Sequence, residues 1–368
     1  MNKITIITAL STANSAFANR LKCICHGLIA NGVRVNVVAV ASNEEVIMSF
    51  LNAKIPFELL SSAKNKYFRY LFSIVRLSFI VRKYDNIFAL VTEPLLLRLL
   101  FVFKRKDAKV FHERTEFPEL TLKGKLLDCY LKSCLKFNHI FVITTALKGY
   151  FISKGVESNR ISILPMLVDP SRFEKPGASV TQYDFQYMAY CGDMGSNKDG
   201  LLNLINSFAI FCQSNADIKL LLIGDTKRQQ DMDNIKYKVR ELHLEGRAIF
   251  TGRKKADEIP SLLLSAKILL LARPNNVQAK YGFPTKLGEY LSTSKPVIVT
   301  DTGDISLYLK DGLSCNIVTA DDDLLFAERM LDVVSNYQKA LAIAEEGHKC
   351  VQDCFNPIVQ TLQIKELL

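Results

Sequence analysis

Several patterns that define common functional classes are missing from this sequence. Its nine cysteines include no C-x-x-C pair, so the spacings of zinc fingers and redox motifs are absent. No run approaches the ~18 to 20 uncharged apolar residues of a membrane-spanning helix. The N-terminus starts directly as a strand, Lys3–Thr8, without the pattern of a cleavable signal. We therefore expect a cytoplasmic protein with free, mostly buried cysteines.

Nucleotide-binding fingerprints are missing as well. The chain has no P-loop, and no G-x-G-x-x-G follows the first predicted strand. The loop at that point, residues 11–16, reads Ser-Thr-Ala-Asn-Ser-Ala and contains no glycine. Small side chains still permit a close approach of backbone, but less freely than glycine does. These absences argue against a dinucleotide-dependent oxidoreductase.

The charge is distributed unevenly along the chain. Residues 1–180 contain 26 Lys and Arg against 13 Asp and Glu, a balance of +13, whereas residues 181–368 contain 21 against 24, a balance of −3. A basic first half predicts an anionic partner, and nucleic acid and an anionic membrane surface are the two candidates.

Strand-like and helix-like segments alternate along the whole chain. Apolar, β-branched runs predict buried parallel strands at residues 3–8, 33–40, 87–91, 108–112, 139–143, 187–191, 218–223, 247–250, 267–271 and 296–300. Amphipathic segments predict helices at residues 14–31, 43–52, 64–84, 122–137, 199–214, 228–241, 257–265, 284–293 and 323–346. This alternation predicts an α/β protein with two doubly wound sheets. Turn-forming residues at 169–185 predict a domain boundary between 178 and 179.

The most informative motif is residues 280–291, Lys-Tyr-Gly-Phe-Pro-Thr-Lys-Leu-Gly-Glu-Tyr-Leu. Pro284 suits the first turn of a helix, and the free N–H groups of that turn, together with Lys286, suit a phosphate. Glu289 follows about one and a half turns later, where its carboxylate would accept hydrogen bonds from a vicinal diol such as a ribose. A capped helix before a buried strand, with Lys286 and Glu289 solvated, is the alternative interpretation.

With Ser294-Lys295-Pro296-Val297 behind it, this motif resembles the donor site of the GT4-like glycosyltransferases of the bacterial surface-polysaccharide type. Further segments resemble that family: Ile163–Phe173, Tyr190–Asp193, Asn197–Gly200, Leu220–Asp225 and Phe250–Arg253. The resemblance implies the GT-B fold, in which two Rossmann-like domains face across a cleft. Residues 1–178 would form the acceptor-side domain and 179–354 the nucleotide-sugar donor domain, with 355–368 crossing back to the first.

The resemblance also implies site residues. His112, at the end of a strand, would contact the transferred sugar; Lys198 would hold the donor diphosphate, and Glu289 the ribose. Lys198 also stands beside a predicted helix start and just after a strand, which favours anions, although a solvated lysine is the alternative. The implied donor-binding set is Gly192, Lys198, Gly224, Arg253, Tyr281, Gly282, Phe283, Pro284, Thr285, Lys286 and Glu289.

Two of these positions depart from the family pattern. Tyr281 stands where the first glutamate of the family's E-x7-E pattern is expected, and Asp193 stands where an arginine is expected after Gly192. Arg253, Arg273 or Lys286 would then have to supply the missing phosphate cation. The identity of the donor therefore stays open. Weak activity, or none, stays open as an alternative.

The resemblance implies that a sugar moves from a nucleotide-diphosphate donor to a hydroxyl on a lipid-linked or polysaccharide precursor. It implies retention of configuration and no metal or other cofactor. One alternative is a nucleotide-sugar 2-epimerase of the same fold, for which Glu113 and Glu116 are the acid/base candidates in the first half. Another is a non-catalytic, membrane-associated partner of a polysaccharide assembly complex, which Tyr281 and Asp193 favour.

Residues 64–83 show the pattern of an interfacial helix. An apolar stripe and a basic line both recur at helical spacing, the first formed by Phe68, Leu71, Phe72, Val75 and Phe79 and the second by Arg69, Arg76 and Lys83. We expect Arg69, Phe72, Arg76 and Lys83 to contact the inner face of the plasma membrane peripherally. A crossover helix packed on the sheet is the alternative. Nucleic acid is not expected, because no reading module is present.

Overall fold

The structure is a computed structural model that describes residues 2–10, 12–13, 15–61, 66–174, 183–195 and 198–368. These residues form two compact units, Met1–Leu167 with Asn356–Leu368 and Val168–Phe355. Several predicted features lie outside the described residues, namely the loop residues Ser11 and Asn14, residue Asn197 and the boundary at 178/179. The chain passes into the second unit between Leu167 and Val168.

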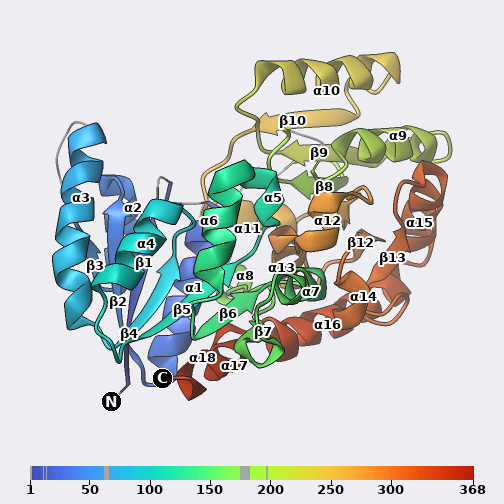
Figure 1. Ribbon diagram of the computed structural model, residues 1–368. Helices are drawn as coiled ribbons and strands as arrows, with labels where there is room; N and C mark the ends of the chain where they lie inside the picture. The colour runs from blue at the N-terminus through green and yellow to red at the C-terminus, as the bar shows by residue number, and fades with distance from the viewer. Residues whose placement is uncertain (1, 11, 14, 62–65, 175–182, 196–197) are drawn as a thin grey trace. The chain divides into compact units, whose positions relative to one another are not determined.

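The first unit is built on a seven-stranded parallel sheet with the strand order β3-β2-β1-β4-β5-β6-β7 (Figure 1). Its strands are β1 (Lys3–Ala9), β2 (Arg34–Ala41), β3 (Phe57–Leu59), β4 (Asn86–Leu90), β5 (Lys109–Arg114), β6 (His139–Val142) and β7 (Ile161–Ile163). The apolar residues of the central strands β4, β5 and β6 are all buried, as a parallel sheet covered by helices requires, whereas those of the edge strand β3 are only partly buried.

Helices connect these strands. In chain order they are α1 (Ala16–Ala30), α2 (Glu44–Asn52), α3 (Lys66–Ile80), the 3₁₀ turn η1 (Val81–Lys83), α4 (Pro94–Phe103), α5 (Pro118–Thr121), α6 (Gly124–Cys134), α7 (Thr145–Ser153) and the 3₁₀ turn η2 (Ser158–Arg160). Helices α3 and α4 contact each other, and α4 also contacts α6.

The last residues of the chain belong to this first unit. Helices α17 (Pro357–Gln360) and α18 (Leu362–Glu366) pack on α1. The Asn31 side chain donates a 2.7 Å hydrogen bond to the Ile358 carbonyl. A Cβ atom at Gly27 would lie 2.3 Å from the Pro357 carbonyl oxygen, so the absence of a side chain lets α17 approach α1 this closely.

The second unit has a six-stranded sheet with the order β10-β9-β8-β11-β12-β13. Its strands, all parallel, are β8 (Tyr187–Cys191), β9 (Lys219–Ile223), β10 (Ala248–Gly252), β11 (Ile268–Leu271), β12 (Val297–Asp301) and β13 (Asn316–Thr319). Its helices are α8 (Ser171–Glu174), α9 (Leu201–Cys212), α10 (Gln229–Glu241), α11 (Ile259–Leu264), α12 (Val277–Tyr281), α13 (Thr285–Leu291), α14 (Ile305–Tyr308), α15 (Asp323–Ser335) and α16 (Tyr337–Cys354). The strand order reverses direction between β8 and β11, which makes that point the topological switch point of the sheet.

The structure confirms the doubly wound α/β prediction. All ten predicted strands exist, and their ends lie within two residues of the predicted ones. The short strands β3, β7 and β13 were missed; each lies at the edge of its sheet, where fewer residues are buried and the apolar signal is weaker. The predicted single helix 323–346 was wrong: it is two helices, α15 and α16, separated at Asn336, whose backbone leaves the helical region at φ −112° and ψ 42°.

Candidate functional site

The switch point of the second sheet gathers several charged residues. Gly192 directly follows β8, and Arg273 lies two residues beyond the end of β11. Helix α9 starts after Gly200, which has a φ of +65°, and a Cβ atom at Gly200 would lie 1.7 Å from the Ala272 carbonyl oxygen. Only glycine fits this conformation and this approach, so the helix begins directly against the end of β11. Lys198 and Asp199, the residues just before Gly200, are thereby brought to the switch point.

Asp199 is the centre of this group. Its side chain is 6% exposed, and its Oδ2 atom accepts hydrogen bonds from Lys286 Nζ at 2.6 Å and from the Tyr190 hydroxyl at 3.0 Å. Arg273 Nε lies 3.8 Å from Oδ1. Burial by itself would raise the pKa of Asp199, but Lys286 and Arg273 outweigh it, so the pKa lies below its usual value. Asp199 is therefore ionised at neutral pH.

Lys286 reaches Asp199 by crossing over Gly192. A Cβ atom at Gly192 would lie 1.8 Å from Lys286 Cε, so the missing side chain creates the path of the lysine. The Lys286 side chain is 20% exposed, and its ammonium group is paired with Asp199. A phosphate at this edge would therefore compete with Asp199 for Lys286. The role of Lys286 in binding a donor stays a prediction.

Lys198 has a different environment from Lys286. Its side chain is partly exposed, and within the described part of the chain it forms no hydrogen bond or ion pair. It stands immediately before Asp199 and the start of α9, where the positive end of the helix dipole favours an anion. Lys198 is thus the least committed cation at the switch point, as its predicted role requires.

Glu289, the predicted ribose ligand, is held by an ion pair. Its Oε1 atom lies 2.7 Å from Arg172 Nη1, and Arg172 lies on α8. The adjacent Tyr290 is fully buried, and its hydroxyl accepts a 2.7 Å hydrogen bond from the Cys191 N–H at the end of β8. This bond fixes α13 against the sheet and orients Glu289. Arg172 was not predicted as a site residue, since it is 117 residues from Glu289 and no spacing in the sequence connects them.

Gly224 and Arg253, two predicted donor-binding residues, lie outside the charged group around Asp199. Gly224 has a φ of +138°, and a Cβ atom there would lie 1.9 Å from the Gly192 carbonyl oxygen. Its missing side chain is therefore explained by the packing of neighbouring strand ends, without a ligand. Arg253 follows β10 and is exposed, and it forms no ion pair among the described residues. Because β10 is two strands from β8, Arg253 starts about 10 Å from the Asp199 group.

The remaining motif residues surround the start of α13. The donor contact predicted for Phe283 is wrong. Its side chain is buried and contacts the rings of Tyr308 and Phe355 at centroid distances of 5.6 and 5.8 Å. Because these contacts place the ring in the core of the second unit, the side chain cannot contact a donor. The residues Tyr281, Gly282 and Thr285 are partly buried, and Pro284 is the N-cap residue of α13. Their donor contacts stay predictions.

Comparison with known proteins identifies this unit. Residues 173–350 match the family model described as glycosyl transferases group 1. The second unit is a group 1 glycosyltransferase domain. The predicted resemblance to a glycosyltransferase family is thereby confirmed for this unit.

Relatives agree with this assignment. A stretch of 126 residues is 26% identical to the 2-deoxystreptamine glucosyltransferase of Streptomyces kanamyceticus, and it covers 32% of this chain and 32% of that protein's length. The match thus spans about a third of the curated relative. The structure of Anabaena HepE in complex with UDP is similar over 99% of both chains, with a TM-score of 0.78 and 17% identity. A glycosyltransferase of Rickettsia africae is similar over 100% of this chain and 98% of that one, with a TM-score of 0.78 and 16% identity. These similarities confirm the GT-B fold.

In the first unit, the structure contradicts the role predicted for His112. The residue lies inside β5, is fully buried and stacks on the Phe137 ring at 4.6 Å. Its Nδ1–H donates to the Ala89 carbonyl at 2.7 Å, and its Nε2 accepts from the Tyr130 hydroxyl at 2.9 Å. Burial lowers the pKa of His112 to about 3. Both ring nitrogens are engaged inside the unit, so His112 is a neutral core residue and cannot touch a sugar.

Glu113, the neighbour of His112, is equally committed. Arg20 holds it through Nε and Nη2, at 3.0 and 2.7 Å from Oε1, and both side chains are almost completely buried. The same guanidinium donates to the carbonyls of Leu164 and Pro165. This buried pair joins α1 to β5 and to the segment after β7, and it commits Glu113 Oε1 to a structural ion pair.

The predicted interfacial helix exists as α3. Its apolar face is exposed, with 56% of Phe72 and 69% of Phe79 accessible, whereas Ser73 and Leu77 on the opposite face are buried. Lys83 is exposed, and Arg76 is half exposed while it contacts the Leu60 carbonyl and Glu58. The side chain of Arg69 lies outside the described residues. The structure therefore leaves an apolar strip beside basic side chains on the surface of the first unit.

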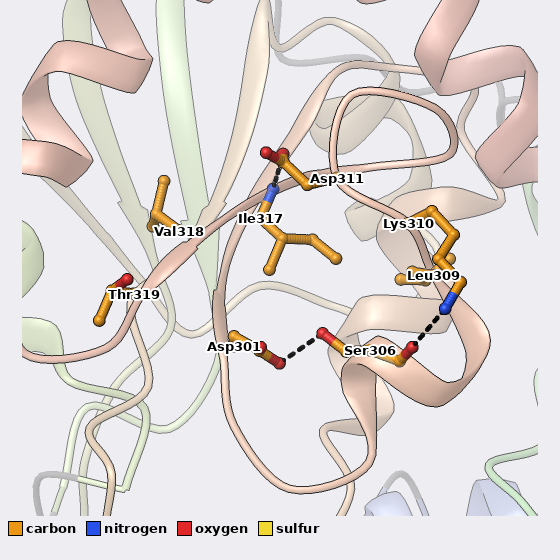
Figure 2. Close-up of a pocket in the computed structure, with 8 residues that line it drawn as sticks. All are labelled: Asp301, Ser306, Leu309, Lys310, Asp311, Ile317, Val318 and Thr319. Carbon is orange, nitrogen blue, oxygen red and sulfur yellow. Dashed lines mark hydrogen bonds between the residues drawn. The ribbon is translucent and has the colours of Figure 1, made fainter.

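A separate hollow lies at the carboxyl ends of β12 and β13 in the glycosyltransferase domain (Figure 2). It has a volume of about 360 Å³, and none of the predicted site residues lines it. Its polar groups bond to one another: the Ser306 hydroxyl donates to Asp301 at 2.7 Å, and Asp311 accepts from the Ile317 N–H at 2.8 Å. None of the residues that line this hollow belongs to the charged group at the β8/β11 switch point.

Two features are absent from the described residues. No helix among them is both long and apolar enough to cross a bilayer. Within the same residues, no cluster of three or more His, Cys, Asp or Glu side chains has the arrangement of a metal site.

Proposed function

We propose that this chain transfers a sugar from a nucleotide-diphosphate donor to a hydroxyl acceptor, with retention of configuration. The observation that carries the proposal is the position of Lys198 and Lys286 at the switch point of a group 1 glycosyltransferase domain. A diphosphate that leaves the sugar takes the electrons of the broken bond, and fixed cations lower the cost of that charge. HepE has been solved with UDP and with UDP-glucose, which makes UDP-sugars the first donors to test.

In this proposal the chain itself neutralises the diphosphate, without a metal ion. Lys198 and the first turn of α9 act on the phosphates directly, and Lys286 joins them when it exchanges Asp199 for phosphate. Glu289 accepts hydrogen bonds from the ribose hydroxyls, and Arg172 must then share or release that carboxylate. The acceptor hydroxyl forms the new bond to the anomeric carbon on the face that the diphosphate leaves, and its proton passes to an oxygen of the departing diphosphate.

The geometry favours a transferase over the 2-epimerase. The epimerase would need acid/base carboxylates in the first unit, but Glu113 is sealed in its pair with Arg20. Glu116 is exposed, and its backbone carbonyl accepts a hydrogen bond from Arg114. A non-catalytic partner of an assembly complex stays the second candidate, because Tyr281 and Asp193 replace charged residues of the family pattern.

We also propose a lipid-linked or polysaccharide acceptor, reached at the inner face of the plasma membrane. Support comes from the exposed apolar strip on α3, with Leu71, Phe72, Val75 and Phe79. Leu95 and Val102 on the adjoining α4 are exposed as well. The excess of basic residues in this half complements anionic lipid headgroups.

The experiment is a thermal-shift screen of the purified chain against UDP- and GDP-sugars, followed by product analysis. A donor at 100 times its dissociation constant stabilises the folded state by about 2.7 kcal/mol. The same donor should leave Lys198→Ala and Glu289→Ala unshifted, and NMR of the product with acceptor should show retained configuration. A C2 epimer formed without acceptor would identify an epimerase. If no nucleotide sugar raises the melting temperature of the chain, a non-catalytic partner is the better description.

A further inference from the structure

Arg273 is a buried cation with unsatisfied guanidinium N–H groups. Its side chain is 1% exposed, and its Nε and Nη1 atoms have no hydrogen-bond partner. Across the described chain, its nearest opposite charge is Asp199 Oδ1, at 3.8 Å from Nε. Burial lowers the pKa of Arg273. A buried guanidinium with unmet N–H groups is costly, and native structures rarely keep one without a reason.

Asp199 cannot satisfy this guanidinium on its own. Its Oδ2 atom already accepts from Lys286 and from Tyr190. One carboxylate therefore faces two cations, which leaves one positive charge in excess. The twelve-residue helix α9 begins beside this group, and the positive end of its dipole adds to the excess. An anion is the partner that this group lacks.

The main chain at Arg273 is fixed in place. The Thr300 hydroxyl, at the carboxyl end of β12, donates a 2.7 Å hydrogen bond to the Arg273 carbonyl. Asp193, which stands where the family pattern has an arginine, is used in its own turn and accepts from the Gly195 N–H at 2.6 Å. The cation that is absent at 193 is thus present one strand away, at the end of β11.

We propose that Arg273 and Lys286 together bind a phosphate group of the donor, and that Asp199 competes with that phosphate for both cations. This inference rests on the proposed function and deepens it. Lys286, the more exposed of the two, meets the phosphate first and leaves Asp199. Arg273 then gains a phosphate oxygen or the freed Asp199 oxygen as its hydrogen-bond partner. Asp199 is a positioning residue that holds both cations at the switch point.

The test measures the binding of inorganic pyrophosphate and of UDP to the full chain by calorimetry. Arg273→Gln should weaken both ligands about tenfold to a hundredfold, because it removes a charge-assisted, two-pronged contact. Arg273→Lys keeps the positive charge but loses the two-pronged guanidinium, so its affinity for both ligands should lie between those of the wild type and Arg273→Gln. Asp199→Asn should strengthen pyrophosphate binding about tenfold, because it removes the competing carboxylate while both cations stay.

The matched control is Arg329→Gln, which removes a guanidinium paired with Asp311 elsewhere in the same domain. It should leave both affinities unchanged. If Asp199→Asn does not fold, Asp199→Ser, which also removes the competing carboxylate, takes its place in the same pyrophosphate titration.

The outcomes separate this inference from the proposed function. If UDP and a UDP-sugar bind but Arg273→Gln binds them equally well, the inference is overturned and the transferase proposal stands. If pyrophosphate binding depends on Arg273 while no nucleotide sugar binds, the anion site is supported and the transferase proposal fails. If Asp199→Asn lowers the affinity for pyrophosphate, Asp199 does not compete with the anion and that part of the inference is overturned.

Discussion

Glu289 and Arg172 form an ion pair with 2.7 Å between Oε1 and Nη1, although 117 residues separate them in the chain. The pair joins α13, which carries the donor motif, to α8 at the start of the second unit. Both side chains are about one-quarter to one-third exposed, so the pair is accessible to a ligand. It gives Glu289 a fixed orientation, and it also occupies one carboxylate oxygen that a ribose would use.

A first prediction concerns this pair. Glu289→Gln should weaken UDP binding by about tenfold to a hundredfold, because hydrogen bonds to a charged acceptor contribute about 1.5 to 3 kcal/mol. Arg172→Gln should have the smaller effect, since the carboxylate that receives the ribose is still present. Calorimetry with UDP measures both variants. If Arg172→Gln is the more damaging of the two, Arg172 and not Glu289 is the ligand contact.

A second prediction concerns the pH dependence of stability through His112. Its pKa is about 3 in the folded chain and about 6.5 when unfolded, so below pH 6.5 the unfolded chain binds the extra proton. Stability from this group is complete above pH 6.5 and is lost as the pH falls towards 3. As the pH falls from 7.5 to 5, protonation of His112 in the unfolded chain should lower the free energy of unfolding by about 2 kcal/mol.

Urea unfolding of the wild type and of His112→Gln at both pH values checks this. The variant can keep hydrogen bonds to Ala89 and Tyr130 but cannot titrate, so its stability should fall less over this interval. Equal losses in the two proteins would show that His112 is not the group responsible. The variant should also retain sugar transfer at pH 7.5, since the residue has no access to substrate.

A third prediction concerns the surface strip on α3. Phe72→Asp and Phe79→Asp should each reduce binding to vesicles of phosphatidylglycerol and phosphatidylcholine about tenfold or more, because burying a phenylalanine side chain contributes about 1.5 to 3 kcal/mol. Leu313→Asp is the matched control, since Leu313 is 67% exposed but lies in the second unit. Vesicle co-sedimentation measures all three. Equal binding to neutral and anionic vesicles would contradict the role of the basic side chains.

A fourth prediction concerns metal dependence. Transfer should continue in excess EDTA, because lysines neutralise the leaving diphosphate in our proposal. Lys198→Ala should lower kcat by about two orders of magnitude, as is usual when a preorganised electrostatic contact is removed. Lys236→Ala, on the exposed face of α10, is the control and should be neutral. Loss of transfer in EDTA with recovery on adding magnesium would contradict the metal-free proposal.

The sequence by itself determined the fold class and most of its elements. The pattern of apolar residues is a local property, and it located ten strands, most of which are buried on both faces. The motif around Lys286 and Glu289 was also recognisable, since residues within one helix keep a fixed spacing. Gly200 stands where the approach of the Ala272 carbonyl requires glycine, and Gly192 stands where the Lys286 side chain crosses the backbone. Both glycines are visible as residue types in the chain.

Only the tertiary structure decided which of these residues meet. His112 looked like a site residue at a strand end, but Phe137 and Tyr130 bury it, and the sequence contains no measure of that desolvation. Arg273 and Asp199 meet because the start of α9 packs against the end of β11. The excess of positive charge around Asp199 therefore cannot be recognised from the order of residues along the chain. Pairings over such distances depend on how strands and helices pack, and the free energy of each charged group depends on the neighbours that packing supplies.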